Sequence, residues 1–186
     1  MKPLCAEILA EFQQMADEQN YLAQALVAAQ TDPRIRTERL MRRMLKKGLS
    51  GGLDKVYSGM EAILLRIVTD VDGGRPGGES WHQRLIDQVA LAIPSVRPAI
   101  LRPQTVEQVK ELLKLRHRVR HLYGAQIRLA RLTEIAATLP QISTDFFQDI
   151  RVFAITVELA TEEEFPVAPQ SGPSFDPDDG TLEGPR

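Results

Sequence analysis

Residues 53–71 read LDKVYSGMEAILLRIVTDV, and their apolar positions recur every three or four residues. This spacing places the apolar side chains on one face of an α-helix. The positions that carry the pattern are Leu53, Val56, Met60, Ile63, Leu64, Ile67 and Val71. The segment therefore predicts a long amphipathic helix, and a fold held together by contacts between helices.

Helical spacing continues toward the N-terminus. Residues 3–30 form one predicted helix, and residues 34–72 form the next, beyond a turn at Thr31-Asp32-Pro33. The glycine cluster at 48–52 leaves two alternatives open. Each glycine costs about 1 kcal/mol relative to alanine in a helix, which favours a break there. Small residues also permit close packing of a second helix, which favours continuity.

The pattern after residue 72 predicts shorter elements. Residues 72–78, DGGRPGG, are a loop, and a helix from Trp81 through Ile93 ends at Pro94. Pro98 and Pro103 predict a non-helical linker over residues 94–104.

Two further helices complete the predicted body. Thr105 and Gln108 have the spacing of a capping box, so we expect a helix to begin at Thr105. It continues to Tyr123 and ends at Gly124. A final helical region follows Thr133, with a restart at Pro140.

The composition agrees with an all-helical protein. Of the 186 residues 43% are hydrophobic and only 5% aromatic, whereas strands favour aromatic and β-branched side chains. One cysteine, Cys5, excludes an internal disulfide framework. We predict an all-α, up-and-down helical bundle, and no span long enough for a membrane. A cytoplasmic location fits these features.

Charge divides the chain into two parts. Residues 162–186 contain seven acids and one base, which leaves 22 bases and 18 acids in residues 1–161. We expect a helical domain over 1–161 and a disordered acidic tail over 162–186. The mildly basic body permits a polyanionic partner without requiring one.

The predicted helix that ends at Tyr123 concentrates chemically active side chains. At about 100° per residue, one half of its circumference carries the polar set Arg116, His117, Arg120, His121 and Tyr123. The opposite side is apolar. Histidine transfers protons near neutral pH, and arginine binds phosphate. Because RNA supplies its own 2′-hydroxyl nucleophile, these groups suffice for metal-independent cleavage.

Composition alone leaves a second reading of this helix open. Arginine and histidine on an exposed helical face are most often a solvated surface. A metal site at His117 and His121 is disfavoured, because Arg116, Arg118 and Arg120 would repel a cation. We expect neither a metal nor a cofactor.

Three blocks of this sequence resemble a known family. The string Arg116-x4-His121-Leu122-Tyr123 is similar to the Arg-x4-His-x-Tyr signature of HepT-type toxins, within the HEPN ribonuclease superfamily. The blocks Tyr57-Ser58-Gly59-Met60-Glu61 and Asp72-Gly73-Gly74 through Glu79-Ser80-Trp81-His82 also resemble that group. The resemblance covers roughly residues 40–158, and excludes the first 35 residues and the acidic tail.

The resemblance implies a HEPN helical bundle that works as a homodimer and cleaves tRNA or mRNA. By it, Arg116 and His121 are catalytic, His117 supports them, and Arg118 and Arg120 bind RNA phosphate. It also implies a partner, an MntA-type nucleotidyltransferase antitoxin that transfers AMP to Tyr123. The alternative is a non-catalytic HEPN-like adaptor that binds a nucleotide or a partner protein.

Two other features have alternative interpretations. Trp81-His82 could stack on a base, although a lone Trp at a helix start more often packs, which we favour. The basic stretch over residues 34–47 is equally well explained as an RNA-tracking surface and as a solvated helix face.

Overall fold

The computed structural model describes residues 2–121 and 127–165, and these residues form six helices without a β-strand. The helices are α1 (Pro3–Thr31), α2 (Arg34–Thr37), α3 (Arg39–Val71), α4 (Trp81–Val89), α5 (Pro103–His121) and α6 (Leu129–Thr156). The prediction of an all-α fold is confirmed. None of the described helices is long and apolar enough to cross a membrane.

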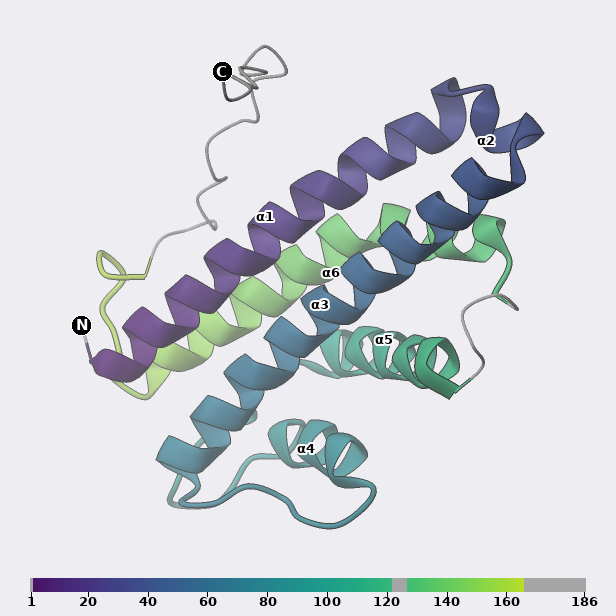
Figure 1. Cartoon of the computed structure of the whole chain (residues 1–186). Helices are drawn as coiled ribbons and strands as arrows, with labels where there is room; N and C mark the ends of the chain where they lie inside the picture. Colours follow the sequence, from purple (N-terminus) through teal and green to yellow (C-terminus); the bar gives the residue numbers. More distant parts are fainter. Residues whose placement is uncertain (1, 122–126, 166–186) are drawn as a thin grey trace, which may run out of the picture.

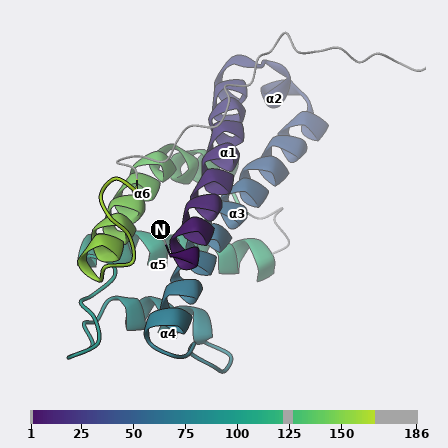
Figure 2. The ribbon, with the colours of Figure 1, turned by 90° about the vertical axis from the view of Figure 1, so that its left-hand side faces the viewer.

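The three long helices form the frame of the molecule. α1 and α3 pack side by side and run in opposite directions, and α6 packs against both (Figure 1). α5 crosses α3 at a steep angle (Figures 1 and 2). α4 lies beside α5, at the lower end of α3. α5 packs against α3, α4 and α6. The helix that carries the predicted chemistry is therefore covered on more than one side.

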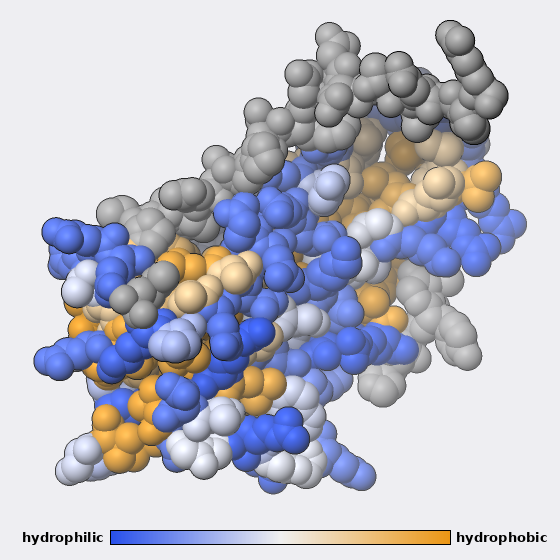
Figure 3. Space-filling model, turned by 60° about the vertical axis from the view of Figure 1, so that its left-hand side comes forward, coloured by the Kyte–Doolittle hydropathy of each residue, from blue (hydrophilic) through white to orange (hydrophobic). Residues whose placement is uncertain are grey.

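Aromatic residues join α1 to α6 in the core. Phe12 packs edge-on against Phe147 with ring centroids 4.7 Å apart, and Phe147 also meets Phe165 at 5.5 Å. Phe165 is fully buried, so ordered packing reaches the end of the described chain. Hydrophilic side chains predominate on the face in Figure 3, where apolar residues show as separate patches. The division of the chain at residue 161 stays a prediction, and residues 166–186 lie outside the described residues.

α3 continues through the glycine cluster, which settles the point that the sequence left open. Gly52 lies against α1 so closely that a Cβ there would approach Leu22 Cδ2 to 2.6 Å. A Cβ at Gly48 or Gly51 would meet nothing within 4 Å. Gly52 thus permits the contact between α1 and α3, and packing outweighs the low helix propensity of its neighbours.

The predicted starts of the last two helices and the predicted restart at Pro140 are wrong. α5 begins at Pro103 and not at a Thr105 cap, and the buried Thr105 hydroxyl has no hydrogen-bond partner. Instead, Asp149 of α6 accepts the backbone N–H of Arg102 at 2.9 Å. α6 starts at Leu129 and passes through Pro140 without a restart. An interior proline costs about 3 kcal/mol, which the packing of buried neighbours such as Leu139 and Ile142 offsets.

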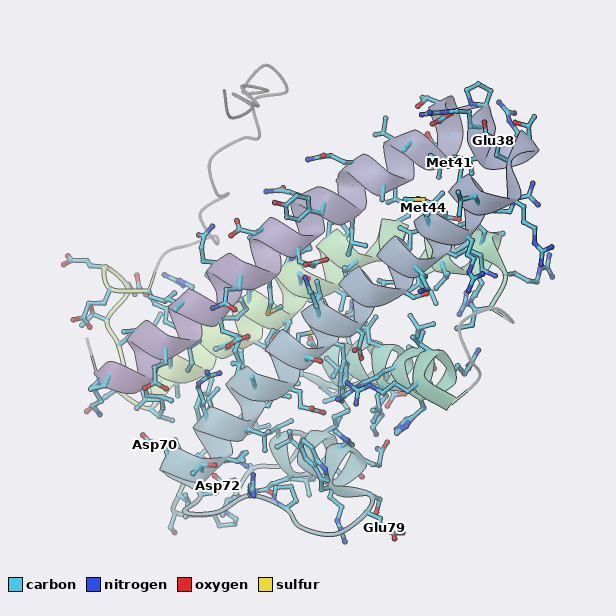
Figure 4. All side chains as sticks on the ribbon, viewed as in Figure 1. Glu38, Met41, Met44, Asp70, Asp72 and Glu79 are labelled. Atoms are coloured by element: carbon cyan, nitrogen blue, oxygen red, sulfur yellow. The ribbon has the colours of Figure 1, made fainter. Side chains whose placement is uncertain are left out.

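α4 is shorter than expected and ends at Val89. The following chain is held by Arg97, whose side chain is 0% exposed. Its guanidinium donates to both carboxylate oxygens of Asp72 and to the carbonyls of Gln88, Leu91 and Pro98. Figure 4 shows Asp72 beside Asp70 at the end of α3 opposite Glu38 and Met44. This buried cation therefore fixes the linker between α4 and α5.

Candidate functional site

Arg116 lies inside the molecule, which corrects the expectation of an exposed guanidinium. The residue is only 8% exposed, and α5 buries Leu112, Leu113 and Leu115 beside it. α5 is covered by α3 on one side and α6 on another. Because of this double coverage, the polar half of the helical wheel is partly an interior face.

The guanidinium of Arg116 is held by two acids of α3. Nη1 donates to both carboxylate oxygens of Glu61 at 3.0 Å, and Nε lies 3.2 Å from Asp54 Oδ1. The Arg116 Cζ atom is also 5.1 Å from the ring centroid of Tyr57. Asp54, Tyr57 and Glu61 follow one another at spacings of three and four residues, so they share one face of α3. The three residues together form a cradle for the arginine.

Tyr57 completes the cradle as a neutral hydrogen-bond donor. Its hydroxyl donates to Glu61 Oε1 at 3.1 Å, and its side chain is fully buried. Burial and the neighbouring Glu61 charge raise the pKa of Tyr57 far above its ordinary value. The phenol therefore stays protonated and keeps Glu61 oriented toward Arg116.

His82 of α4 joins the same cluster, a role that the sequence reasoning missed. Its Nδ1 atom hydrogen-bonds with Glu61 Oε1 and lies 3.4 Å from Arg116 Nη1. Its ring meets that of His117 edge-on, with centroids 6.2 Å apart. The sequence feature that could have pointed to His82 is the block that resembles the HepT-type group and ends in Trp81-His82. Trp81 itself is half-buried and packs against the core, as expected.

The other predicted site residues lie in different places. His117 is exposed beside His82, and Arg120 is 52% exposed with Nη2 3.4 Å from Asp54 Oδ2. Arg118 instead borders a groove of about 660 Å³ between α5 and α6, where Arg131 is also found. His121 is the last residue of α5, but its side chain lies outside the described residues, as does Tyr123. The structure thus gathers Arg116, His117 and Arg120, and places Arg118 apart from them.

Comparison with known families identifies the chain. Residues 48–157 match the family described as HepT-like protein, which covers more than half of the sequence. The chain belongs to the HepT-like family. No curated protein and no solved structure shows a significant match to it.

The HepT-like segment contains the whole cluster around Arg116. Asp54, Glu61, His82, Arg116 and Arg120 all fall between residues 48 and 157. The long α1 lies outside the matched residues, although it packs along α3. The site therefore lies within the residues that match the family, and α1, which lies outside them, packs on α3.

The charges in this HepT-like cluster are nearly balanced. The carboxylates of Asp54 and Glu61 offset the guanidiniums of Arg116 and Arg120. An anion such as phosphate would share these guanidiniums with the acids. Within the described residues, no group of three His, Cys, Asp or Glu side chains is arranged to hold a metal ion.

Proposed function

We propose that this HepT-like protein is the toxin of a type VII toxin–antitoxin system, a metal-independent endoribonuclease that cuts tRNA or mRNA. The observation that supports it most is the fixed position of Arg116. Glu61 and Asp54 hold its guanidinium 3.4 Å from Nδ1 of His82, whose ring meets that of the exposed His117. A rigid cation beside imidazoles is the arrangement that stabilises charge as it develops on a phosphate.

The proposed reaction uses the RNA 2′-hydroxyl as nucleophile. His121 and His117 serve as the proton acceptor and donor: one takes the 2′-hydroxyl proton as the oxygen attacks phosphorus, and the other protonates the departing 5′-oxygen. The products are a 2′,3′-cyclic phosphate and a 5′-hydroxyl. Arg120 binds the phosphate from the exposed side, and Arg116 supplies a fixed positive charge from the buried side. Arg118, on the other side of α5, binds RNA only beyond the scissile phosphate.

The cluster on one chain forms half of the working enzyme in this proposal. Two copies form a homodimer in the cytoplasm, with their arginine–histidine motifs facing one another. An MntA-type nucleotidyltransferase antitoxin silences the dimer by transferring AMP from ATP to the hydroxyl of Tyr123, three residues beyond Arg120, with release of pyrophosphate. The added phosphate occupies the guanidiniums and its bulk blocks the RNA.

Cleavage by purified variants tests the ribonuclease proposal. We expect His121→Ala to abolish cleavage of a tRNA pool, and Arg120→Ala to reduce kcat/KM by about tenfold, the loss of one charge-assisted hydrogen bond. Lys114→Ala is the matched control, because Lys114 is exposed on the same helix and pairs with the exposed Glu111. Wild-type cleavage by His121→Ala with the dimer intact would refute the mechanism.

Burial of Arg116 also favours a second candidate, a non-catalytic adaptor that binds a nucleotide or a partner protein. A cation that is 8% exposed and paired with two carboxylates has the environment of a structural ion pair. An adaptor would bind its nucleotidyltransferase and leave RNA intact at any protein concentration. The cleavage assay above therefore separates the two candidates.

A further inference from the structure

A small cavity lies beside the cluster, between the glycine loop and the start of α4. Its volume is about 250 Å³, and its lining residues are Arg75, Pro76, Gly77, Gly78 and Trp81. Gly78 has a φ of +84°, a conformation that favours glycine, and the Arg84 side chain donates to the carbonyl of Gly77. The loop is thus shaped by its own residues and fastened to α4.

Trp81 connects this cavity to the arginine–imidazole cluster. Its ring lies over that of His82 with centroids 3.7 Å apart and an interplanar angle of 30°. His82 in turn contacts Glu61 and Arg116, and its ring faces that of His117. A group in the cavity would therefore be separated from His82, and so from the arginine–imidazole cluster, by the ring of Trp81.

The cavity suits a flat, aromatic ligand that carries a negative charge. Trp81 offers an aromatic surface, and glycine backbone leaves room for a planar ring to approach. Arg75 borders the cavity and Arg84 braces its loop, so the surroundings favour a ring whose attached sugar carries a phosphate. Glu79, the acid of this segment, lies at the outer edge of the loop in Figure 4.

We propose that Trp81 and the loop residues 75–78 form a nucleobase subsite, which receives a base of the RNA next to the phosphate that is cut. This proposal rests on the ribonuclease function and adds to it a determinant of base preference. A base held against Trp81 positions its neighbouring phosphate near His117 and Arg120. Free mononucleotides share the same chemistry, so the test includes both sources.

Trp81 is the only tryptophan of the chain, so its fluorescence reports on binding at this ring and at the His82 ring stacked on it. We would titrate the full-length protein with an oligoribonucleotide whose 2′-hydroxyls are all methylated and which cannot be cut. Saturable quenching is expected, and AMP should quench only at much higher concentration. Equal affinity for AMP and the oligomer would overturn the assignment to RNA, and the absence of quenching would overturn the subsite.

Two glycine variants provide a matched pair. A Cβ at Gly77 or Gly74 would meet nothing within 4 Å, and neither residue has a positive φ, but only Gly77 borders the cavity. Gly77→Leu should fill the cavity and weaken oligomer binding about tenfold, the typical loss of one stacked base. Gly74→Leu should bind like wild type. Equal affinities for the two variants would contradict the proposal.

RNA cleavage measured on the same preparations distinguishes failure of the subsite proposal from failure of the ribonuclease proposal on which it rests. Cleavage with an unresponsive Trp81 would overturn the subsite and leave the ribonuclease standing. Quenching that Gly77→Leu removes, in a protein that cuts no RNA, would support the subsite and overturn the ribonuclease.

Discussion

Arg116 donates two hydrogen bonds of 3.0 Å from one nitrogen to the carboxylate of Glu61, across 55 residues of sequence. Both residues are 8% exposed. The pair ties α5 to α3 at the point where the proposed chemistry takes place. Stability and the proposed activity therefore depend on the same contact.

Glu61→Ala should lower the free energy of unfolding by at most about 3–5 kcal/mol, the cost of removing one partner of a buried ion pair, because Asp54 still pairs with Arg116. Tyr57 and His82 also lose their hydrogen-bond partner in this variant. Glu61→Gln should cost less because it retains an acceptor for Tyr57. Urea denaturation followed by circular dichroism measures both values.

The matched control for Glu61 is Glu111→Ala, which breaks the exposed pair with Lys114 on α5. It should change stability by less than about 1 kcal/mol. A Glu61→Ala value no larger than that of Glu111→Ala would show that the pair does not stabilise the fold.

The neighbouring glycines of α3 should respond in opposite directions to alanine. Gly51→Ala should stabilise the protein by up to about 1 kcal/mol, because the new methyl group meets nothing and helix propensity improves. Gly52→Ala should destabilise it, since its Cβ would lie 2.6 Å from Leu22 Cδ2 and 2.9 Å from Glu18 Oε1. Thermal unfolding of the two variants gives the sign directly, and a gain in Gly52→Ala would mean that α1 moves away without cost.

The helices of this protein are predictable because their apolar spacing is a local property of the sequence. The residues at which the helices begin and end are less predictable. Thr105 and Gln108 have a correct capping pattern, but Asp149 accepts the N–H of Arg102 from a helix far along the chain. The same limit explains Pro140, because the packing that keeps α6 continuous is tertiary.

The candidate site was predictable in part for the same reason. The motif places Arg116, His117 and Arg120 on one helix, and their spacing in the sequence is enough to predict this. Their partners Asp54 and Glu61 interrupt an apolar helix face, and a carboxylate at such a position requires a cation elsewhere. The sequence thus predicts that these acids pair with a cation but does not show which one, because Glu61 and Arg116 lie 55 positions apart.

Asp72 should make stability sensitive to acid. Its hydrogen bonds with Arg97, followed by those with Gln88, hold the pKa of this carboxyl below its usual range. A lowered folded-state pKa contributes stability that is present above the unfolded pKa and is lost as pH falls through the folded pKa. Asp72→Asn should therefore be less stable than wild type at pH 7, and the difference should shrink below about pH 4. Urea denaturation across this range measures it, and a constant difference would exclude Asp72 as the titrating group.

Tyr123→Phe should separate toxicity from its control. Phenylalanine retains the ring but has no hydroxyl to accept AMP, so the variant should still cut RNA while co-expressed nucleotidyltransferase fails to silence it. Intact-mass measurement should find one or more adenylyl groups on the wild-type chain and none on the variant. Tyr21→Phe is the matched control, since Tyr21 is 61% exposed on α1. An unmodified Tyr123 in a neutralised wild-type complex would show that the antitoxin acts by binding alone, and the AMP-transfer part of the proposal would then fall while the cleavage mechanism would stand.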